Sequence, residues 1–183
     1  LQQTDPNAKS QALEAFLQQY PNSVVKVSAL ELLMGAYQQA NNPQKMADAA
    51  QRLLQGDPGN LRALALLTFT NRMCAAQPGP NAVTCLNDAG KYGQQGLQAL
   101  QSAQPPAGVS PEDFAKLKQQ TTPIFAGAVG MQALQAKNYP QAAEALSQAV
   151  AANPNDLQNV YPLALAYLSQ NPMDPKGLFW IAK

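Results

Sequence analysis

Two cysteines are the residues of this chain best suited to covalent chemistry. Cys74 and Cys85 flank a Pro- and Gly-containing turn at residues 77–83, one near the end of an expected helix and the other near the start of its antiparallel partner. Two Cβ atoms at such a turn can lie within the roughly 4 Å that a disulfide requires. A disulfide would pin the turn and indicate an oxidising compartment, whereas the alternative is two buried free thiols.

Catalytic groups are scarce in the rest of the 183-residue sequence. The chain has no His, which excludes Ser-His and Cys-His nucleophiles, zinc-protease helices and any imidazole metal ligand. Its 11 acidic residues are scattered, and no G-x-x-x-x-G-K-[ST] loop is present. We therefore expect a protein that is not an enzyme, with no catalytic residues, no metal site and no cofactor.

A second conspicuous pattern is a glycine stripe. Gly90, Gly93 and Gly96 recur at every third residue inside a helical pattern, and no Lys-Ser/Thr pair follows them. This spacing places small residues along one side of a helix, where they allow a neighbouring helix to approach despite a propensity cost of about 1 kcal/mol per Gly. The stripe therefore predicts helix packing and not phosphate binding.

Composition and charge narrow the class of partner. Hydrophobic residues make up 46% of the chain and charged residues only 13%, and the net charge is +1. Without a basic run or an acidic tail, the sequence has no electrostatic signature of binding to nucleic acid or anionic lipid. No stretch approaches the roughly 18 apolar residues that cross a bilayer. We expect a protein or peptide partner, no nucleic acid and no membrane span.

The clearest structural pattern lies at residues 123–156, where two short amphipathic helices are predicted. Apolar residues recur at helical spacing in both halves, first at Ile124, Val129, Ala133 and Leu134, then at Ala142, Ala145, Leu146 and Ala149. Residues 138–140 break the pattern between the halves, and residues 153–155 close it. Small residues predominate where the helices must cross.

This helix pair resembles a tetratricopeptide repeat, a helix-turn-helix unit of about 34 residues. The spacing matches the pattern of the family at Ala126, Val129, Gly130, Ala133, Ala142, Leu146 and Pro154, with Ala and Leu in place of its aromatic residues. The resemblance implies an all-α fold in which antiparallel helix pairs stack into a right-handed superhelix, a TPR-like α-solenoid.

On this pattern, residues 1–183 form a single repeat array. It comprises a partial repeat at 5–22, repeats at 23–58, 60–103 and 111–154, and a truncated repeat at 155–183, with insertions at 77–83 and 103–110. Asp5-Pro6 is expected to open the first helix, and a long helix starting after Ser110 is expected to bend or break near Pro123. Because the chain begins at Leu1 without an initiator Met and stops soon after a helix starts, we expect a fragment of a longer protein.

The resemblance also implies a concave groove formed by the first helix of each pair. Projected onto this chain, the groove positions are Arg62, Phe69, Arg72, Met73, Ile124, Met131, Leu134, Tyr161, Leu165 and Leu168. This lining is mainly apolar, which predicts a non-enzymatic scaffold that binds an apolar or amphipathic segment of a peptide or partner protein. The insertions could instead shift the frame and turn some of these side chains into the core.

Two further expectations concern the alternative function and the location. The chain could be a structural spacer or a self-association module, a possible homodimer, whose apolar face is covered by missing C-terminal repeats. Residues 16–23 resemble repeats common in bacterial envelope proteins. With the possible disulfide, this favours an extracytoplasmic location, periplasmic or secreted, while a cytoplasmic one stays open. The identity of the partner and the oligomeric state do not follow from the sequence.

Overall fold

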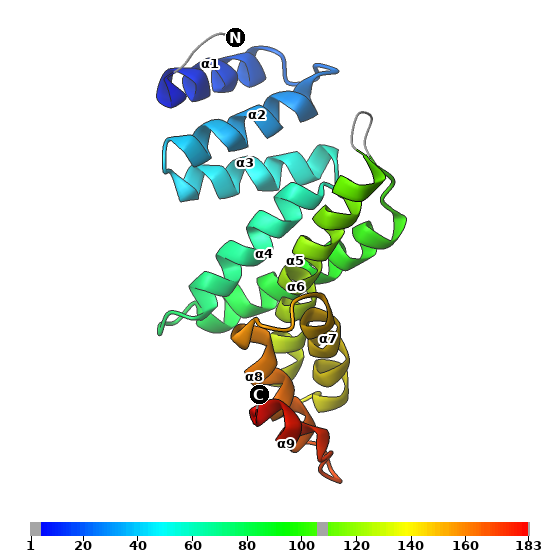
Figure 1. Ribbon diagram of the computed structural model, residues 1–183. Coiled ribbons are helices and arrows are strands. Elements are labelled where there is room, and N and C mark those ends of the chain that lie inside the picture. Colours follow the sequence, from blue (N-terminus) through cyan, green and yellow to red (C-terminus); the bar gives the residue numbers. More distant parts are fainter. Residues whose placement is uncertain (1–4, 106–109, 183) are drawn as a thin grey trace. The chain divides into compact units, whose positions relative to one another are not determined.

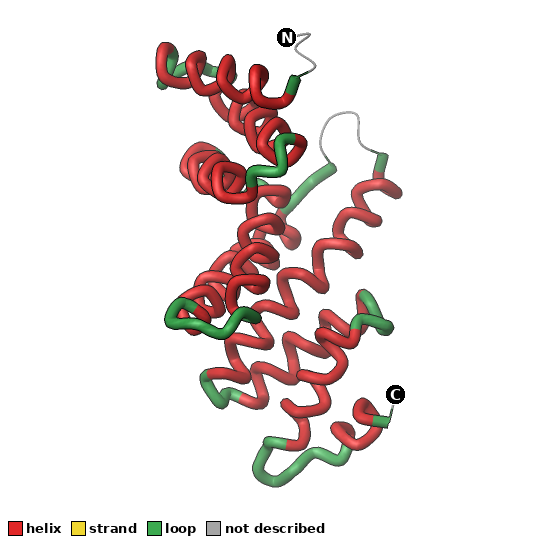
Figure 2. The backbone as a smooth tube through the Cα atoms, turned by 90° about the vertical axis from the view of Figure 1, so that its left-hand side faces the viewer, coloured by secondary structure: helices red, strands yellow, loops and turns green. Residues whose placement is uncertain are grey.

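The computed structural model describes residues 5–105 and 110–182, and every regular element of these residues is an α-helix (Figure 1). The helices are α1 (Pro6–Gln19), α2 (Lys26–Gln39), α3 (Pro43–Gly56), α4 (Leu61–Ala75), α5 (Ala82–Ser102), α6 (Pro111–Gln135), α7 (Tyr139–Ala152), α8 (Leu157–Leu168) and α9 (Lys176–Ile181). Figure 2 likewise contains only helices and loops over these residues. The all-α prediction is confirmed for this part of the chain. The insertion expected at 103–110 lies partly outside the described residues.

The chain divides into two compact units, Leu1–Leu67 and Thr68–Lys183, and the boundary falls within α4. In the N-terminal unit, α1 packs against α2 and α2 packs against α3, one beside the next (Figure 1). The core of this unit is made of side chains that are at most 6% exposed, including Leu13, Leu17, Leu30, Leu33, Tyr37 and Leu53.

Helix α6 is the centre of the C-terminal unit. It packs against α5, α7 and α8, and α8 packs in turn against α7 and α9. The core between α6, α7 and α8 consists of Ala133, Ala142, Ala143, Leu146, Val150, Val160, Leu163 and Ala166, with Leu134, Tyr167 and Trp180 packed against it at its edge.

The turn between α2 and α3 has the same geometry as the turn between α6 and α7. Asn41 and Lys137 adopt left-handed backbone conformations, with φ angles of 51° and 58°. The amide of the following residue, Asn42 or Asn138, donates to the carbonyl of the residue five positions earlier, at 2.9 Å and 2.8 Å. This is the Schellman ending of a helix, in which orphan carbonyls find donors.

In both turns the next helix is capped by an asparagine followed closely by a proline. The side chain of Asn42 accepts a hydrogen bond from the Lys45 amide, and that of Asn138 accepts one from the Gln141 amide. An Asn cap satisfies one of the backbone donors that a helix start leaves unpaired. Both capped helices contain 14 residues, so the two helix pairs share the turn, the cap and the length of the second helix.

The two helix pairs differ in which of their two helices contributes the larger side chain where the helices cross. A Cβ atom at Gly130 of α6 would overlap the side chain of Leu146 of α7, so only Gly fits there. When the two pairs are aligned on their left-handed residues, Met34 takes the place of Gly130 and Ala50 that of Leu146, and both are at most 2% exposed. The larger Met34 is therefore matched with the small residue Ala50, whereas Gly130 is matched with the large Leu146.

The glycine stripe of α5 lies against α6. A Cβ atom at Gly93 would lie 2.7 Å from the backbone oxygen of Phe125, and one at Gly96 would lie 2.5 Å from the Phe125 ring. Real Cβ atoms are not found so close to other heavy atoms, because interiors are close-packed. The prediction that the stripe allows a neighbouring helix to approach is confirmed.

Helix α6 continues through Pro123 and is not broken there. It starts at the expected cap, where Ser110 Oγ accepts a 3.0 Å hydrogen bond from the Asp113 amide. A proline inside a helix has no N–H, so the carbonyl four residues earlier, that of Gln119, loses its helical donor. The turn before Pro123 gains side-chain contacts instead, since the hydroxyl of Thr122 donates to the Lys118 carbonyl at 2.7 Å.

Candidate functional site

The C-terminal unit contains a pocket of about 490 Å³ between α4, the middle of α6 and the turn that joins α7 to α8. We call it the Arg72 pocket, and it is lined by Phe69, Arg72, Gln119, Gln120, Pro123, Ile124, Ala152, Asn153, Asp156 and Gln158. Three predicted groove residues, Phe69, Arg72 and Ile124, are therefore brought together in it. Such a volume is within the range of small-ligand sites.

Arg72 is the positively charged group of the pocket. Burial lowers the pKa of its guanidinium below the ordinary value, and the nearby carboxylate of Asp156 acts in the opposite direction. Its Nη2 atom donates a hydrogen bond of 3.4 Å to Oδ1 of Asn159. A guanidinium has five N–H donors in a planar fork, so this side chain can donate further hydrogen bonds to a planar acceptor.

The side chain of Asn159 forms hydrogen bonds with both charged residues of the pocket, Arg72 and Asp156. Its side chain is fully buried, and its Nδ2 atom donates to Asp156 Oδ2 at 2.7 Å and to the Pro123 carbonyl at 3.4 Å. Gly127 makes room for it, because a Cβ atom there would overlap Asn159 Oδ1 and lie 2.9 Å from Arg72 Nη1. One amide thus links α8 to α4 and α6.

Asp156 is the negatively charged group of the pocket and also the N-cap of α8. Its Oδ1 atom accepts a 3.0 Å hydrogen bond from the Gln158 amide, and its Oδ2 atom accepts the bond from Asn159. Among the ion pairs that the described residues form, none joins Arg72 to Asp156, and each of the two contacts a different end of the Asn159 amide. The pocket therefore contains two opposite charges that an amide keeps apart.

The other predicted groove residues are distributed differently. Met73, Tyr161 and Leu165 are exposed, whereas Met131, Leu134 and Leu168 are partly buried. Leu134 packs against the core of α6, α7 and α8, and Leu168 lies against Gly177 of α9. Arg62 belongs to the N-terminal unit, where its Nη2 atom donates to Gln38 Oε1 at 3.3 Å.

Sequence analysis did not identify Asp156, Asn159 or Gly127 as site residues. The signal for Asp156 was present, because an Asp directly after the break at 153–155 is typical of a helix N-cap. No local pattern connects Asn159 to Arg72, which lies 87 residues earlier in the chain.

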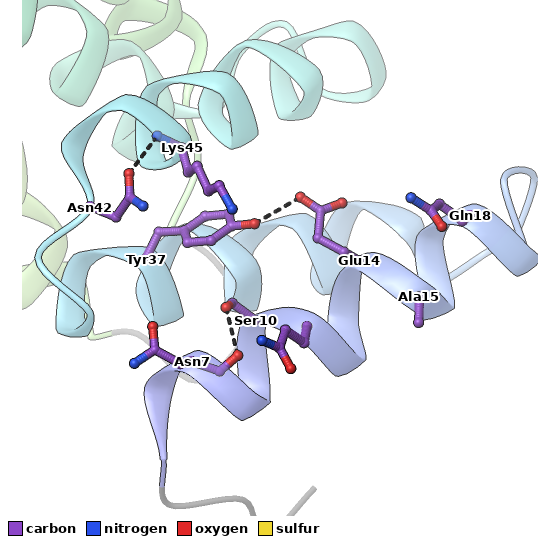
Figure 3. Close-up of a pocket in the computed structure, with 9 residues that line it drawn as sticks. Asn7, Ser10, Glu14, Ala15, Gln18, Tyr37, Asn42 and Lys45 are labelled. Atoms are coloured by element: carbon purple, nitrogen blue, oxygen red, sulfur yellow. Dashed lines mark hydrogen bonds between the residues drawn. The ribbon is translucent and has the colours of Figure 1, made fainter.

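The N-terminal unit has a polar pocket of about 370 Å³, lined by Asn7, Ser10, Gln11, Glu14, Ala15, Gln18, Tyr37, Asn42 and Lys45 (Figure 3). The hydroxyl of Tyr37 donates a 3.0 Å hydrogen bond to Glu14 Oε1, and Arg52 Nη1 lies 2.9 Å from both oxygens of the same carboxylate. Burial, followed by the hydrogen bond to Glu14, raises the pKa of Tyr37 to about 12. The carboxylate of this pocket already has protein partners, which indicates a structural role.

The N-terminal unit also has an apolar groove of about 410 Å³ between α1 and α2. We call it the α1–α2 groove, and its lining is Ala12, Leu13, Phe16, Val25, Ser28, Ala29 and Leu32. Val25 and Leu32 are 49% and 46% exposed. Exposed apolar surface that lines a hollow is typical of a contact with another apolar surface.

A disulfide joins Cys74 of α4 to Cys85 of α5 in the structure, with the two Cα atoms 5.8 Å apart. This separation is typical of disulfides. Within residues 5–105 and 110–182, no group of three or more acidic or sulfur ligands could hold a metal ion. Over the same residues, no helix is long and apolar enough to cross a membrane.

Comparison of the chain with models of known protein families and with curated proteins found no match. Its function is therefore inferred from the chemistry of its own surfaces.

Proposed function

We propose that this chain is a non-enzymatic scaffold that binds a peptide or a partner protein through an apolar face of the Thr68–Lys183 unit. The observation that carries the proposal is that α4 and α8 each expose two large apolar side chains, four residues apart. Phe69 and Met73 of α4 are 53% and 49% exposed, and Tyr161 and Leu165 of α8 are 67% and 48% exposed. Residues four apart share one face of a helix, so each helix presents two large apolar side chains together.

We further infer that the helix pairs α2–α3 and α6–α7 are repeats of a TPR-like α-solenoid, stacked as a right-handed superhelix. Support comes from the turn that the two pairs share, with its left-handed residue, its Asn cap and a second helix of 14 residues. Gly130 and Leu146 in one pair correspond to Met34 and Ala50 in the other. A larger side chain on one helix is thus offset by a smaller one on its neighbour, as expected for two diverged copies of one packed unit.

The chemistry of the proposed face favours an amphipathic segment as ligand. Burying two or three large apolar side chains contributes roughly 1.5–3 kcal/mol each before the cost of association. We therefore expect micromolar binding. The disulfide between Cys74 and Cys85 supports an extracytoplasmic location, such as a bacterial periplasm, because disulfides persist in oxidising compartments.

The test is selection from a displayed library of random peptides, followed by binding measurements with the selected peptides. We expect amphipathic sequences whose binding is abolished by Tyr161→Asp or Leu165→Asp. Val83→Asp is the matched control, because Val83 is 55% exposed in the same unit at the start of α5 and lies outside the proposed face. Peptides that bind all three variants equally would contradict the proposed face.

Self-association is the second candidate function, and two exposed apolar surfaces favour it. The α1–α2 groove is open, and Leu178, Phe179 and Ile181 of α9 are 57%, 64% and 57% exposed. If these surfaces join copies of the chain, sedimentation equilibrium detects a dimer or a larger assembly that Leu32→Asp dissociates. A monomer at all concentrations would exclude this function.

A further inference from the structure

We propose that the Arg72 pocket binds a free α-amino acid with an apolar side chain, with its carboxylate on Arg72 and its ammonium group on Asp156. This ligand is a small molecule and differs from the peptide or protein proposed for the exposed apolar face. Either proposal can therefore fail without the other.

The first observation is that the pocket contains both charges without joining them. Arg72 and Asp156 both line it, and the buried Asn159 amide lies between them with Oδ1 toward the guanidinium and Nδ2 toward the carboxylate. Partly buried charges are costly unless each has a close partner of opposite sign. A zwitterion supplies both partners at once.

The second observation is that both charged groups have unused hydrogen-bonding capacity toward a ligand. A carboxylate accepts about four hydrogen bonds, and Asp156 receives one from the Gln158 amide and one from Asn159. The guanidinium of Arg72 matches a planar carboxylate, with which it forms paired, charge-assisted hydrogen bonds. Gln119 and Gln120 also line the pocket, and a Gln side-chain amide can either donate or accept a hydrogen bond.

The charge pattern selects against simpler ligands. An anion alone would meet the carboxylate of Asp156, and a cation alone would meet the guanidinium of Arg72. Repulsion of the wrong ligand is a source of specificity, and here it acts against both classes. Phe69 and Ile124 line the remainder of the pocket, so the side chain of the amino acid is expected to be apolar.

The test is isothermal titration of the intact chain with three probes of similar size. L-Leucine carries both charges, N-acetyl-L-leucine lacks the ammonium group, and L-leucinamide lacks the carboxylate. We expect saturable binding of leucine and binding of each analogue weaker by about tenfold or more, as for the loss of one partner of a buried charge pair. No binding of leucine, or equal binding of the three probes, would overturn the proposal.

Two variants test which residue binds the ammonium group of leucine and which binds its carboxylate. Asp156→Asn keeps the shape and the N-cap of α8, because Asn is also a good cap, and should weaken leucine binding while reducing the preference over N-acetyl-L-leucine. Arg72→Gln should weaken leucine binding while reducing the preference over L-leucinamide. Arg62→Gln is the control for the loss of a positive charge, because Arg62 lies in the other unit.

The outcomes separate the two proposals. Leucine binding that persists in Tyr161→Asp, together with loss of peptide binding, would support both. If either pocket variant fails to fold, as judged by its helical circular dichroism, the comparison of the three probes on the natural chain still decides. Leucine binding that is unchanged in folded Asp156→Asn and Arg72→Gln would contradict the pocket as the site.

Discussion

The hydroxyl of Tyr37 in α2 donates a 3.0 Å hydrogen bond to the carboxylate of Glu14 in α1. Burial and this bond raise the pKa of Tyr37 from 10.0 to about 12. A pKa that is higher in the folded state contributes stability below the unfolded pKa, and this contribution is lost as the pH rises through the folded value. The contact therefore links α1 to α2 most strongly below pH 10.

We expect Tyr37→Phe to change how stability depends on alkaline pH. In the natural chain the contribution of Tyr37 falls between pH 10 and about 12, because unfolded Tyr ionises there before folded Tyr does. Tyr37→Phe lacks this decline. The melting temperatures of the natural chain and of Tyr37→Phe should therefore converge between pH 10 and about 12. The measurement is thermal unfolding by circular dichroism from pH 8 to 12, and parallel curves would contradict the raised pKa.

The Gly96 contact with Phe125 predicts an unusual response to alanine. In a helix interior Gly→Ala ordinarily stabilises by about 1 kcal/mol. Here the added Cβ would lie 2.5 Å from the Phe125 ring, which is fully buried in a close-packed core. Overpacking costs roughly 1–3 kcal/mol, so Gly96→Ala should lower the free energy of unfolding in urea.

Gly79→Ala is the matched control for this effect. No atom lies within 4 Å of a Cβ built at Gly79, which is in the turn between α4 and α5. We expect its free energy of unfolding to change by less than about 0.5 kcal/mol. A stabilised Gly96→Ala protein would show that α5 and α6 are not held at the distance described.

The Cys74–Cys85 pair predicts a result for thiol chemistry. Denatured, unreduced protein should give no reaction with a thiol reagent, and two reactive thiols would contradict the disulfide and remove the support for an extracytoplasmic location. The double variant Cys74→Ser/Cys85→Ser should lose about 2–3 kcal/mol of unfolding free energy, because the short loop is no longer closed in the unfolded chain. Reduced natural protein serves as the comparison.

The two left-handed turn residues are expected to respond differently to substitution by glycine. Lys137 has φ of 58°, a conformation that costs a residue with a side chain roughly 1–2 kcal/mol. Glycine removes this cost but loses more backbone entropy on folding, so Lys137→Gly should stabilise by about 0.5–1 kcal/mol. Asn41, with φ of 51°, tolerates the conformation better, and Asn41→Gly should be nearly neutral in the same urea titration. Equal effects at both positions would contradict this account.

Local interactions made the helices of this protein predictable from its sequence. The caps at Asp5, Asn42, Ser110 and Asn138 contact amides two or three residues further on, so each lies within a few letters of the helix that it starts. The glycine stripe of α5 was predictable for a similar reason, because helical periodicity alone places Gly90, Gly93 and Gly96 on one side.

Only the tertiary structure decided which polar groups distant in the sequence meet. Arg72 meets Asn159 across 87 residues of sequence, and Glu14 meets Arg52 across 38. Of the bend or break that the sequence predicts at Pro123, the break is wrong, because α6 continues through this residue. Its neighbours α5, α7 and α8 pack along it, and Asn159 of α8 donates to the Pro123 carbonyl. Periodicity specifies which residues share a helix face. Which distant charged residues meet depends on how the packed helices cross, because such contacts form between helices and not within one.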